Sequence, residues 1–261
     1  MIKNPSLPTL ISGFRTLEFD LPTALLKQVI ALFDKMSAAP LAPDDTALIP
    51  NAKGVYQLFH RGKLVYIGKV DGKTGLRNRL SRHAWNIKSR GSLDVHNLSF
   101  KAIQVLVFSA MDLENDLIAH YKKEKQPPVW NGSGFGNNDP GRRRDTTVLK
   151  SDGFDALHPI NIDLQILANW DDGSTALQAL AVLSGSVPYT VRHAKSKDDV
   201  AELVSFPKPT TQPTTARLAM NSICAALPKG WQATRLSGRV ILYREEKDDY
   251  PGGEVIARSQ D

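Results

Sequence analysis

The chain has 261 residues, of which 41% are hydrophobic, so it can build one sizeable domain with additions or two small domains. Lys and Arg outnumber Asp and Glu by 33 to 27, and the resulting net charge of +6 suits either plain solubility or a polyanionic partner. The single cysteine, Cys224, excludes a disulfide within the chain and a zinc site built from several cysteines.

The first half of the chain predicts a small α+β domain. An amphipathic pattern indicates a helix over residues 22–36, and a loop rich in Ala, Pro and Asp follows over 38–50. Runs of β-branched and aromatic residues then predict two strands that a short turn joins into an antiparallel hairpin. We therefore expect a three-stranded antiparallel sheet flanked by helices, with strands at 54–59, 64–67 and 102–108 and helices at 76–88 and 113–125.

The second half is less informative. A loop rich in Gly and Asn covers residues 131–141, and a Pro/Thr-rich segment after residue 205 is the best candidate for a linker. Helices are predicted over 175–183 and 216–226, with short strands near 231–234 and 240–243. The expected organisation is an N-terminal helical arm (1–50), a core (51–160), a helical extension (161–205), a linker (206–216) and a small C-terminal α+β segment (217–261).

Two tyrosines mark the predicted hairpin. Tyr56 and Tyr66 lie on adjacent strands, and cross-strand pairing can bring both side chains to one face. Strand tyrosines most often pack in cores, so the pair alone indicates little. Gly54 and Gly68 bracket the hairpin, and a glycine at the end of a strand permits close approach of another group.

The helix predicted over 76–88 is basic. Arg79 and His83 are four residues apart, so they project from one face at the border of the apolar stripe. No acidic residue lies between Arg77 and Arg90, so the usual ion-pair partners are missing. This pattern favours phosphate binding over a merely solvated surface.

Two further polar residues follow. Glu114 lies on the apolar face of its predicted helix, where a carboxylate needs a cation, an arginine or helix-end amides, unless it only complements the helix dipole. Asn131 opens the Gly-rich loop, where a turn role is the default.

The order of these elements resembles the GIY-YIG endonuclease superfamily over residues 52–131. The triplet Gly54-Val55-Tyr56 differs from that pattern only in the middle residue, and Tyr66-Ile67-Gly68 matches it in full. Arg-x-x-x-His, Glu and Pro-x-x-Asn then follow in sequence. Segments such as Trp130-Asn131-Gly132 and Leu157-His158-Pro159 are also similar to type II restriction endonucleases with SacII-like (CCGCGG) specificity.

The resemblance implies Mg²⁺-dependent hydrolysis of duplex DNA, with Mn²⁺ as a possible substitute, and a metal held by Glu114. It implies Tyr56 as general base with His83 bonded to it, although His83 as the base remains an alternative. Tyr66 and Arg79 would position the phosphate, and Asn131 would orient the phosphate or Glu114. The candidates for DNA contacts are Lys69, Arg77, Arg82, Arg142, Arg143 and Arg144.

A palindromic target implies two active sites, so we expect a homodimer or a higher homo-oligomer. A restriction enzyme also implies a cognate DNA methyltransferase as its genetic partner. The start of the chain lacks the apolar core of a signal peptide, and no apolar run could span a bilayer, so we expect a soluble cytoplasmic protein with no membrane partner. The alternatives are a repair or homing nuclease on the same core and a catalytically silent DNA-binding module.

Overall fold

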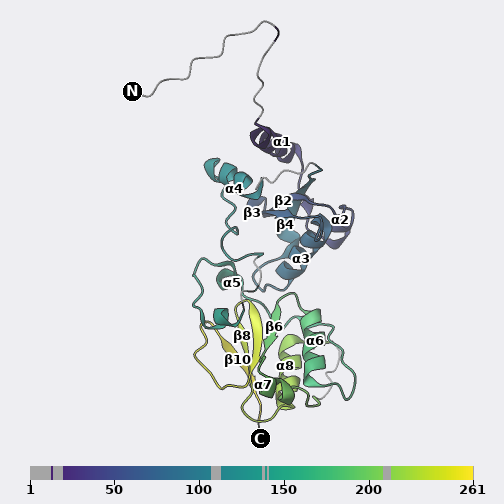
Figure 1. The fold of residues 1–261 in the computed structure, drawn as a ribbon, viewed down its shortest axis with the longest axis vertical. Coiled ribbons are helices and arrows are strands. Elements are labelled where there is room, and N and C mark those ends of the chain that lie inside the picture. Colours follow the sequence, from purple (N-terminus) through teal and green to yellow (C-terminus); the bar gives the residue numbers. More distant parts are fainter. Residues whose placement is uncertain are drawn as a thin grey trace, which may run out of the picture.

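The computed structural model describes residues 13, 20–106, 113–136, 139, 141–207 and 213–260. Two units follow one another along the chain, and the first lies above the second in Figure 1. The first unit is a sheet with helices on both faces. Its elements are α1 (Leu21–Lys35), β1 (Ala39–Pro40), α2 (Pro43–Ala47), β2 (Gly54–His60), β3 (Lys63–Val70), α3 (Leu76–Lys88), a 3-10 helix η1 (Val95–Asn97), β4 (Leu98–Gln104) and α4 (Leu113–Lys123).

The sheet of this first unit has four strands in the order β1-β4-β2-β3, and every pair is antiparallel. The sequence predicted three strands and missed the fourth, β1, because this strand has only two residues and carries no alternating pattern. The third predicted strand is β4, which begins at Leu98 and ends at Gln104; residues 107 and 108 of the predicted range lie outside the described residues.

Each face of this sheet has its own core. Tyr56, Leu58 and Tyr66 pack with the apolar stripe of α3, which includes Leu76 and Leu80. Strand pleating turns their neighbours to the opposite face. There a second cluster joins the sheet to α1 and α4, through Val29, Phe33, Val55, Ile67, Leu113 and Leu117.

Helix α1 is therefore part of the first unit. Phe33 of α1 is completely buried, and its carbonyl accepts a hydrogen bond from Lys101 Nζ at 2.7 Å. The described part of the expected N-terminal helical arm (1–50) thus contains a helix that packs on the sheet, and residues 1–12 and 14–19 of that range lie outside the described residues. The amphipathic helix was predicted, but the sequence carries no signal for the surface against which it packs.

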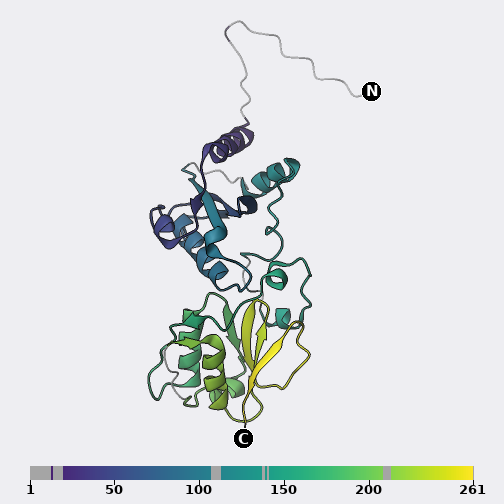
Figure 2. The same cartoon turned by 180° about the vertical axis from the view of Figure 1, so that it is seen from behind.

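The second unit is a mixed four-stranded sheet in the order β10-β8-β9-β6, in which β6 runs parallel to β9. The helices α6 and α8 lie side by side against it (Figures 1 and 2). A connecting segment contains η2 (Arg142–Thr146) and α5 (Phe154–Leu157). The elements that follow are β5 (Gln165–Ile166), α6 (Ala176–Ser186), β6 (Thr190–His193), α7 (Lys197–Glu202), β7 (Thr214–Thr215), α8 (Ala216–Ala225), β8 (Gln232–Leu236), β9 (Arg239–Tyr243) and β10 (Glu254–Arg258).

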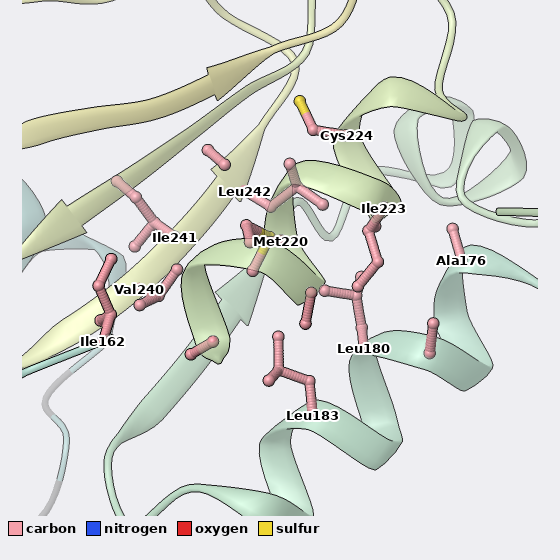
Figure 3. Close-up of a cluster of buried hydrophobic side chains, with 14 of the residues drawn as sticks. Ile162, Ala176, Leu180, Leu183, Met220, Ile223, Cys224, Val240, Ile241 and Leu242 are labelled. Carbon is pink, nitrogen blue, oxygen red and sulfur yellow. The ribbon is translucent and has the colours of Figure 1, made fainter. Parts of the chain in front are cut away.

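One hydrophobic core joins residues on both sides of the predicted linker. Leu180 and Leu183 of α6 and Met220 and Ile223 of α8 meet Leu242 of β9 (Figure 3). The expected helical extension (161–205) and the expected C-terminal segment (217–261) therefore share a core. The sequence suggested two pieces because β6 is short and pairs with a strand almost fifty positions later.

Candidate active site

The two tyrosines lie on the face of the first sheet that α3 covers. Tyr56 on β2 pairs with Gly68 on β3, and Tyr66 pairs with Leu58. The rings of Tyr56 and Tyr66 are 6.1 Å apart, centroid to centroid. A Cβ atom on Gly68 would overlap the phenol of Tyr56, so the last glycine of the second triplet provides space for that ring.

Arg79 and His83 approach the tyrosines from α3. The hydroxyl of Tyr56 lies 2.8 Å from Nε2 of His83, and Nε of Arg79 donates to the same hydroxyl at 3.3 Å. Leu76, at the start of α3, is buried against the sheet and orients the helix. Helix periodicity then turns the residues at 79 and 83 toward Tyr56.

Burial sets the protonation of this network. His83 is 3% exposed, and burial, with the nearby charges of Arg79 and Arg82, lowers its pKa to about 3, so the imidazole is neutral near pH 7. Burial also raises the pKa of Tyr56, so its phenol keeps its proton. The Tyr56 hydroxyl thus lies between the guanidinium of Arg79 and Nε2 of His83, and the tautomer of His83 decides whether the hydroxyl or the imidazole donates the hydrogen bond between them.

Glu114 lies in the first turn of α4 and is half-buried. Its charge acts on both tyrosines: burial and then Glu114 raise the pKa of Tyr66, and Glu114 makes a smaller contribution at Tyr56. The carboxylate is thus within electrostatic reach of the tyrosine pair, although the two elements are separated by more than forty positions. Sequence spacing alone did not establish this proximity.

The donor set near the tyrosines restricts the kind of metal. Within the described ranges, no group of three or more His, Cys, Asp or Glu residues could enclose an ion. Zinc sites need three or four such ligands. Magnesium is commonly held by one or two carboxylates together with waters and substrate phosphate, and Glu114 supplies a donor of that kind.

The Gly-rich loop that begins at Asn131 lies against the same cluster. Phe135 stacks on His83 with ring centroids 4.8 Å apart, and the carbonyl of Gly136 accepts a hydrogen bond from Arg79 at 3.2 Å. Gly136 has a φ of 73°, and a Cβ atom there would be 3.1 Å from the hydroxyl of Tyr66. The backbone therefore approaches the site as only glycine allows.

Asn131, at the start of the Gly-rich loop, lies against the edge strand β3. Its side-chain amide accepts from the backbone N–H of Ile67 and donates to the carbonyl of Ile67, both at 2.8 Å. The amide thus continues the hydrogen-bond pattern of β3 at the edge of the sheet. Both polar atoms contact the backbone of Ile67, so Asn131 anchors the loop to the sheet, and its role in orienting the phosphate or Glu114 stays a prediction.

The candidate DNA-contacting residues do not form one patch. Lys69 is exposed and follows Gly68, so the pleat of β3 directs it away from the face that carries Tyr66. Arg77 is exposed and donates to the carbonyl of Ile49 at 2.7 Å. Arg82 is exposed on α3 beside the site.

The three consecutive arginines of η2 also diverge. Arg142 pairs with Glu245 at 3.2 Å and lies over the ring of Tyr243. Arg143 is exposed, whereas Arg144 is half-buried and faces the same cavity as Arg79 and His83. Of this run, only Arg144 lies beside the candidate active site.

Sequence reasoning missed a buried ion cluster that joins the two units. Asp145 is 1% exposed in its side chain and accepts from Arg192, at 2.6 Å, and from Arg239, at 3.2 Å. The hydroxyl of Tyr243 donates to the same carboxylate at 2.8 Å. Asp139 accepts from both arginines as well. No local pattern could have revealed this cluster, because its acids and bases are about fifty to one hundred positions apart.

A comparison with models of protein families finds a match over residues 67–168. This segment matches the model described as the Eco29kI GIY-YIG domain. Arg79, His83, Glu114 and Asn131 lie within the matched range, whereas Tyr56 and Tyr66 lie just before it. The match covers less than half of the chain. It supports the GIY-YIG restriction endonuclease family and, with it, a nuclease function.

A search of curated proteins found no match to this chain. Among the helices in the described ranges, none is both long and apolar enough to cross a membrane.

Proposed function

We propose that this protein is a Mg²⁺-dependent, site-specific endonuclease for duplex DNA, a type II restriction enzyme. The observation that carries the proposal is the buried network in which Tyr56 contacts both His83 and Arg79, beside a segment with a GIY-YIG family match. Phosphodiester hydrolysis needs a deprotonated water and positive charge near the phosphate. The network offers a proton-accepting pair and a guanidinium at one place.

Glu114 would hold Mg²⁺, or Mn²⁺ in its place. The carboxylate by itself raises the pKa of Tyr66 and Tyr56, which opposes a role for either phenol as a base. A bound divalent cation supplies the opposite charge and stabilises an anionic oxygen nearby. The remaining sites on the ion would be left to water and to the DNA phosphate.

His83 is the proposed proton acceptor for Tyr56, because its Nε2 lies 2.8 Å from the Tyr56 hydroxyl. In the tautomer with a free Nε2 lone pair, His83 would take the proton of Tyr56, and Arg79 would stabilise the phenolate oxygen. Because burial lowers the pKa of His83 and raises that of Tyr56, this transfer would need the bound phosphate and the cation, whose charges favour the imidazolium and the phenolate. Tyr56 could in turn accept the proton of the attacking water. His83 acting directly as the base is the alternative, but the Tyr56 hydroxyl lies between His83 Nε2 and Arg79, which favours the relay.

Arg79 and Tyr66 are the groups that would position the scissile phosphate. Arg79 contacts the hydroxyl of Tyr56 and the carbonyl of Gly136, and it also interacts with Tyr66, so its guanidinium lies beside the tyrosine pair where a phosphate would bind. Tyr56 has no exposed surface, whereas Tyr66 is 7% exposed. A phosphate would therefore meet the Tyr66 side of the pair first.

We further propose a short palindromic target of the CCGCGG type and cleavage by a homodimer or a higher homo-oligomer, since a two-fold site needs two active centres. A cognate DNA methyltransferase would protect the host sequence, and both enzymes would act in the cytoplasm. These points rest on the resemblance to the SacII-like branch.

The test is digestion of a plasmid of known sequence by the full chain with Mg²⁺, followed by mapping of the ends. Discrete ends at one palindrome support the proposal, and a methylated copy of that site should resist cutting. Random nicks, or cuts at branched structures, would instead indicate a repair or homing nuclease. DNA binding without any cutting would indicate a silent binding module.

A further inference from the structure

A cleft of about 160 Å³ opens between the two units beside the candidate active site. One wall belongs to the first unit and includes Arg79, Arg82 and His83 of α3. The other wall belongs to the second unit and includes Tyr189 and Thr190 at the start of β6. Only the first wall could be anticipated from the nuclease motifs.

The acids that line this cleft are already paired. Asp155 accepts a hydrogen bond from Arg90 at 2.9 Å. Asp139 is bound by Arg192 and, at 3.4 Å, by Arg239. Both acids that line the cleft are therefore paired with Arg90, Arg192 or Arg239. The other three arginines of the lining, Arg79, Arg82 and Arg144, have no carboxylate partner among the described lining residues.

Arg82 and Arg144 stand out among these cations. In the described part of the chain, neither guanidinium has a hydrogen bond or an ion pair, and Arg144 is nevertheless half-buried. The guanidinium of Arg144 lies against the Gly-rich loop. A Cβ atom at Gly134 would be 3.5 Å from Nη2 of Arg144. A partly desolvated guanidinium near other cations is unfavourable unless an anion joins it.

The buried ion cluster explains why Arg144 keeps this position. Asp145 directly follows it and is fixed by Arg192, Arg239 and Tyr243 of the second unit. The backbone N–H of Arg144 also donates to the carbonyl of Gly141 at 3.2 Å. The second unit thus holds η2 so that one arginine faces the cleft, while its own arginines are satisfied elsewhere.

We propose that this cleft binds a backbone phosphate of the DNA other than the one that is cut, with Arg82 and Arg144 as ligands and the second unit as the opposite wall. This inference rests on the proposed DNA-cleaving function and assigns part of the DNA-binding surface to residues beyond the family match. Arginine suits the role because its planar fork binds phosphate oxygens with two hydrogen bonds.

The first experiment measures binding of a fluorescent duplex without Mg²⁺ at several NaCl concentrations. A duplex of about 30 bp is long enough to span one site with its flanks. Each lost phosphate contact lowers the salt slope by about 0.9 and the affinity by roughly tenfold near 0.1 M salt. We expect both the lower salt slope and the roughly tenfold loss of affinity for Arg144→Gln and for Arg82→Gln. Lys195→Gln removes one positive charge from an exposed position that does not line this cleft, and it should match the wild type.

The second experiment tests the wall from the second unit. Thr190→Glu places a negative charge in the cleft and should weaken binding more than tenfold. Ser184→Glu adds the same charge on an exposed position of α6 and is the matched control. Thermal melting of each variant checks the fold, which the arginine variants should retain because those side chains make no bonds in the described residues.

The outcomes separate the two proposals. A wild-type protein that neither binds nor cuts DNA would overturn the proposed function and this inference with it. A wild-type protein that cuts DNA, while Arg144→Gln keeps the wild-type salt slope, would overturn the phosphate site alone. Equal binding by Thr190→Glu and Ser184→Glu would remove the second unit from the DNA-binding surface.

Discussion

Gly68 pairs directly with Tyr56 across the β2–β3 ladder, and the phenol of Tyr56 fills the space that a side chain at position 68 would need. The glycine of the second triplet therefore sets the position of the tyrosine of the first. That tyrosine contacts His83 and Arg79, so the whole network depends on the missing Cβ atom.

Replacement of Gly68 by Ala should displace the ring of Tyr56. Overpacking of this kind costs about 1 to 3 kcal/mol of the free energy of unfolding, and it should also lower DNA cleavage strongly. Both quantities can be measured by urea denaturation and by plasmid digestion. Gly72→Ala is the matched control, because no atom lies within 4 Å of the added methyl group. Cleavage by Gly68→Ala at the wild-type rate would refute this relationship.

Replacement of Tyr56 by Phe should remove the proton-transferring hydroxyl while keeping the ring in the core. General acid–base groups contribute about 100-fold to 10,000-fold to a rate, so single-turnover cleavage should slow by that order with DNA binding retained. Tyr121→Phe removes a hydroxyl from the opposite face of the sheet and should cut normally. If Tyr56→Phe cuts as fast as Tyr121→Phe, His83 or another group must be the base.

Replacement of Glu114 by Gln keeps the size of the side chain and removes its charge. Cleavage should be lost at all Mg²⁺ and Mn²⁺ concentrations, because the cation would lose its protein ligand, while binding of DNA in EDTA should persist. Asp116→Asn changes an exposed acid of the same helix turn and serves as the control. Metal-dependent cleavage by Glu114→Gln would rule out Glu114 as the ligand.

The buried imidazole of His83 should make the protein less stable as the pH falls below neutral. An unfolded chain protonates this group near pH 6.5, whereas burial lowers its pKa in the folded protein to about 3. The unfolded state therefore binds more protons between these values, so the free energy of unfolding falls as the pH drops below about 6.5, by up to about 1.4 kcal/mol per pH unit.

Urea denaturation at pH 7 and pH 5 can isolate this contribution. His83→Gln should lose less stability over that interval than the wild type. His96→Gln changes an imidazole whose side chain is 89% exposed, and it should behave as the wild type does. Equal losses in His83→Gln and the wild type would mean that His83 is not the neutral, buried acceptor of the Tyr56 network.

Replacement of Asp145 by Asn should destabilise the protein more than any surface ion-pair change. Arg192 and Arg239 would lose a buried partner, and breaking a buried pair costs about 3 to 5 kcal/mol. Asp163→Asn breaks the ion pair between Asp163, whose side chain is 55% exposed, and Arg217. It should lower the free energy of unfolding by about 1 kcal/mol or less. Similar urea midpoints for both variants would show that the cluster contributes little.

Local patterns in the sequence were sufficient for the elements that surround the site. Helix α3 begins at Leu76 and ends at Lys88, as its apolar spacing predicted, and that spacing also placed Arg79 and His83 on one face. The β2–β3 hairpin followed from two strand-like runs around a short turn. These features repeat every two or 3.6 residues, so they can be read without knowing the fold.

Tertiary structure alone decided how those elements are used. It tied Asn131 to the backbone of Ile67, turned Lys69 to the other face of the sheet and paired Asp145 with arginines of the second unit. It also separated Arg144 from its neighbour Arg142, which faces Tyr243. Such contacts join residues that are distant in the chain, and their energy depends on burial and on distances between side chains, neither of which a sequence pattern contains.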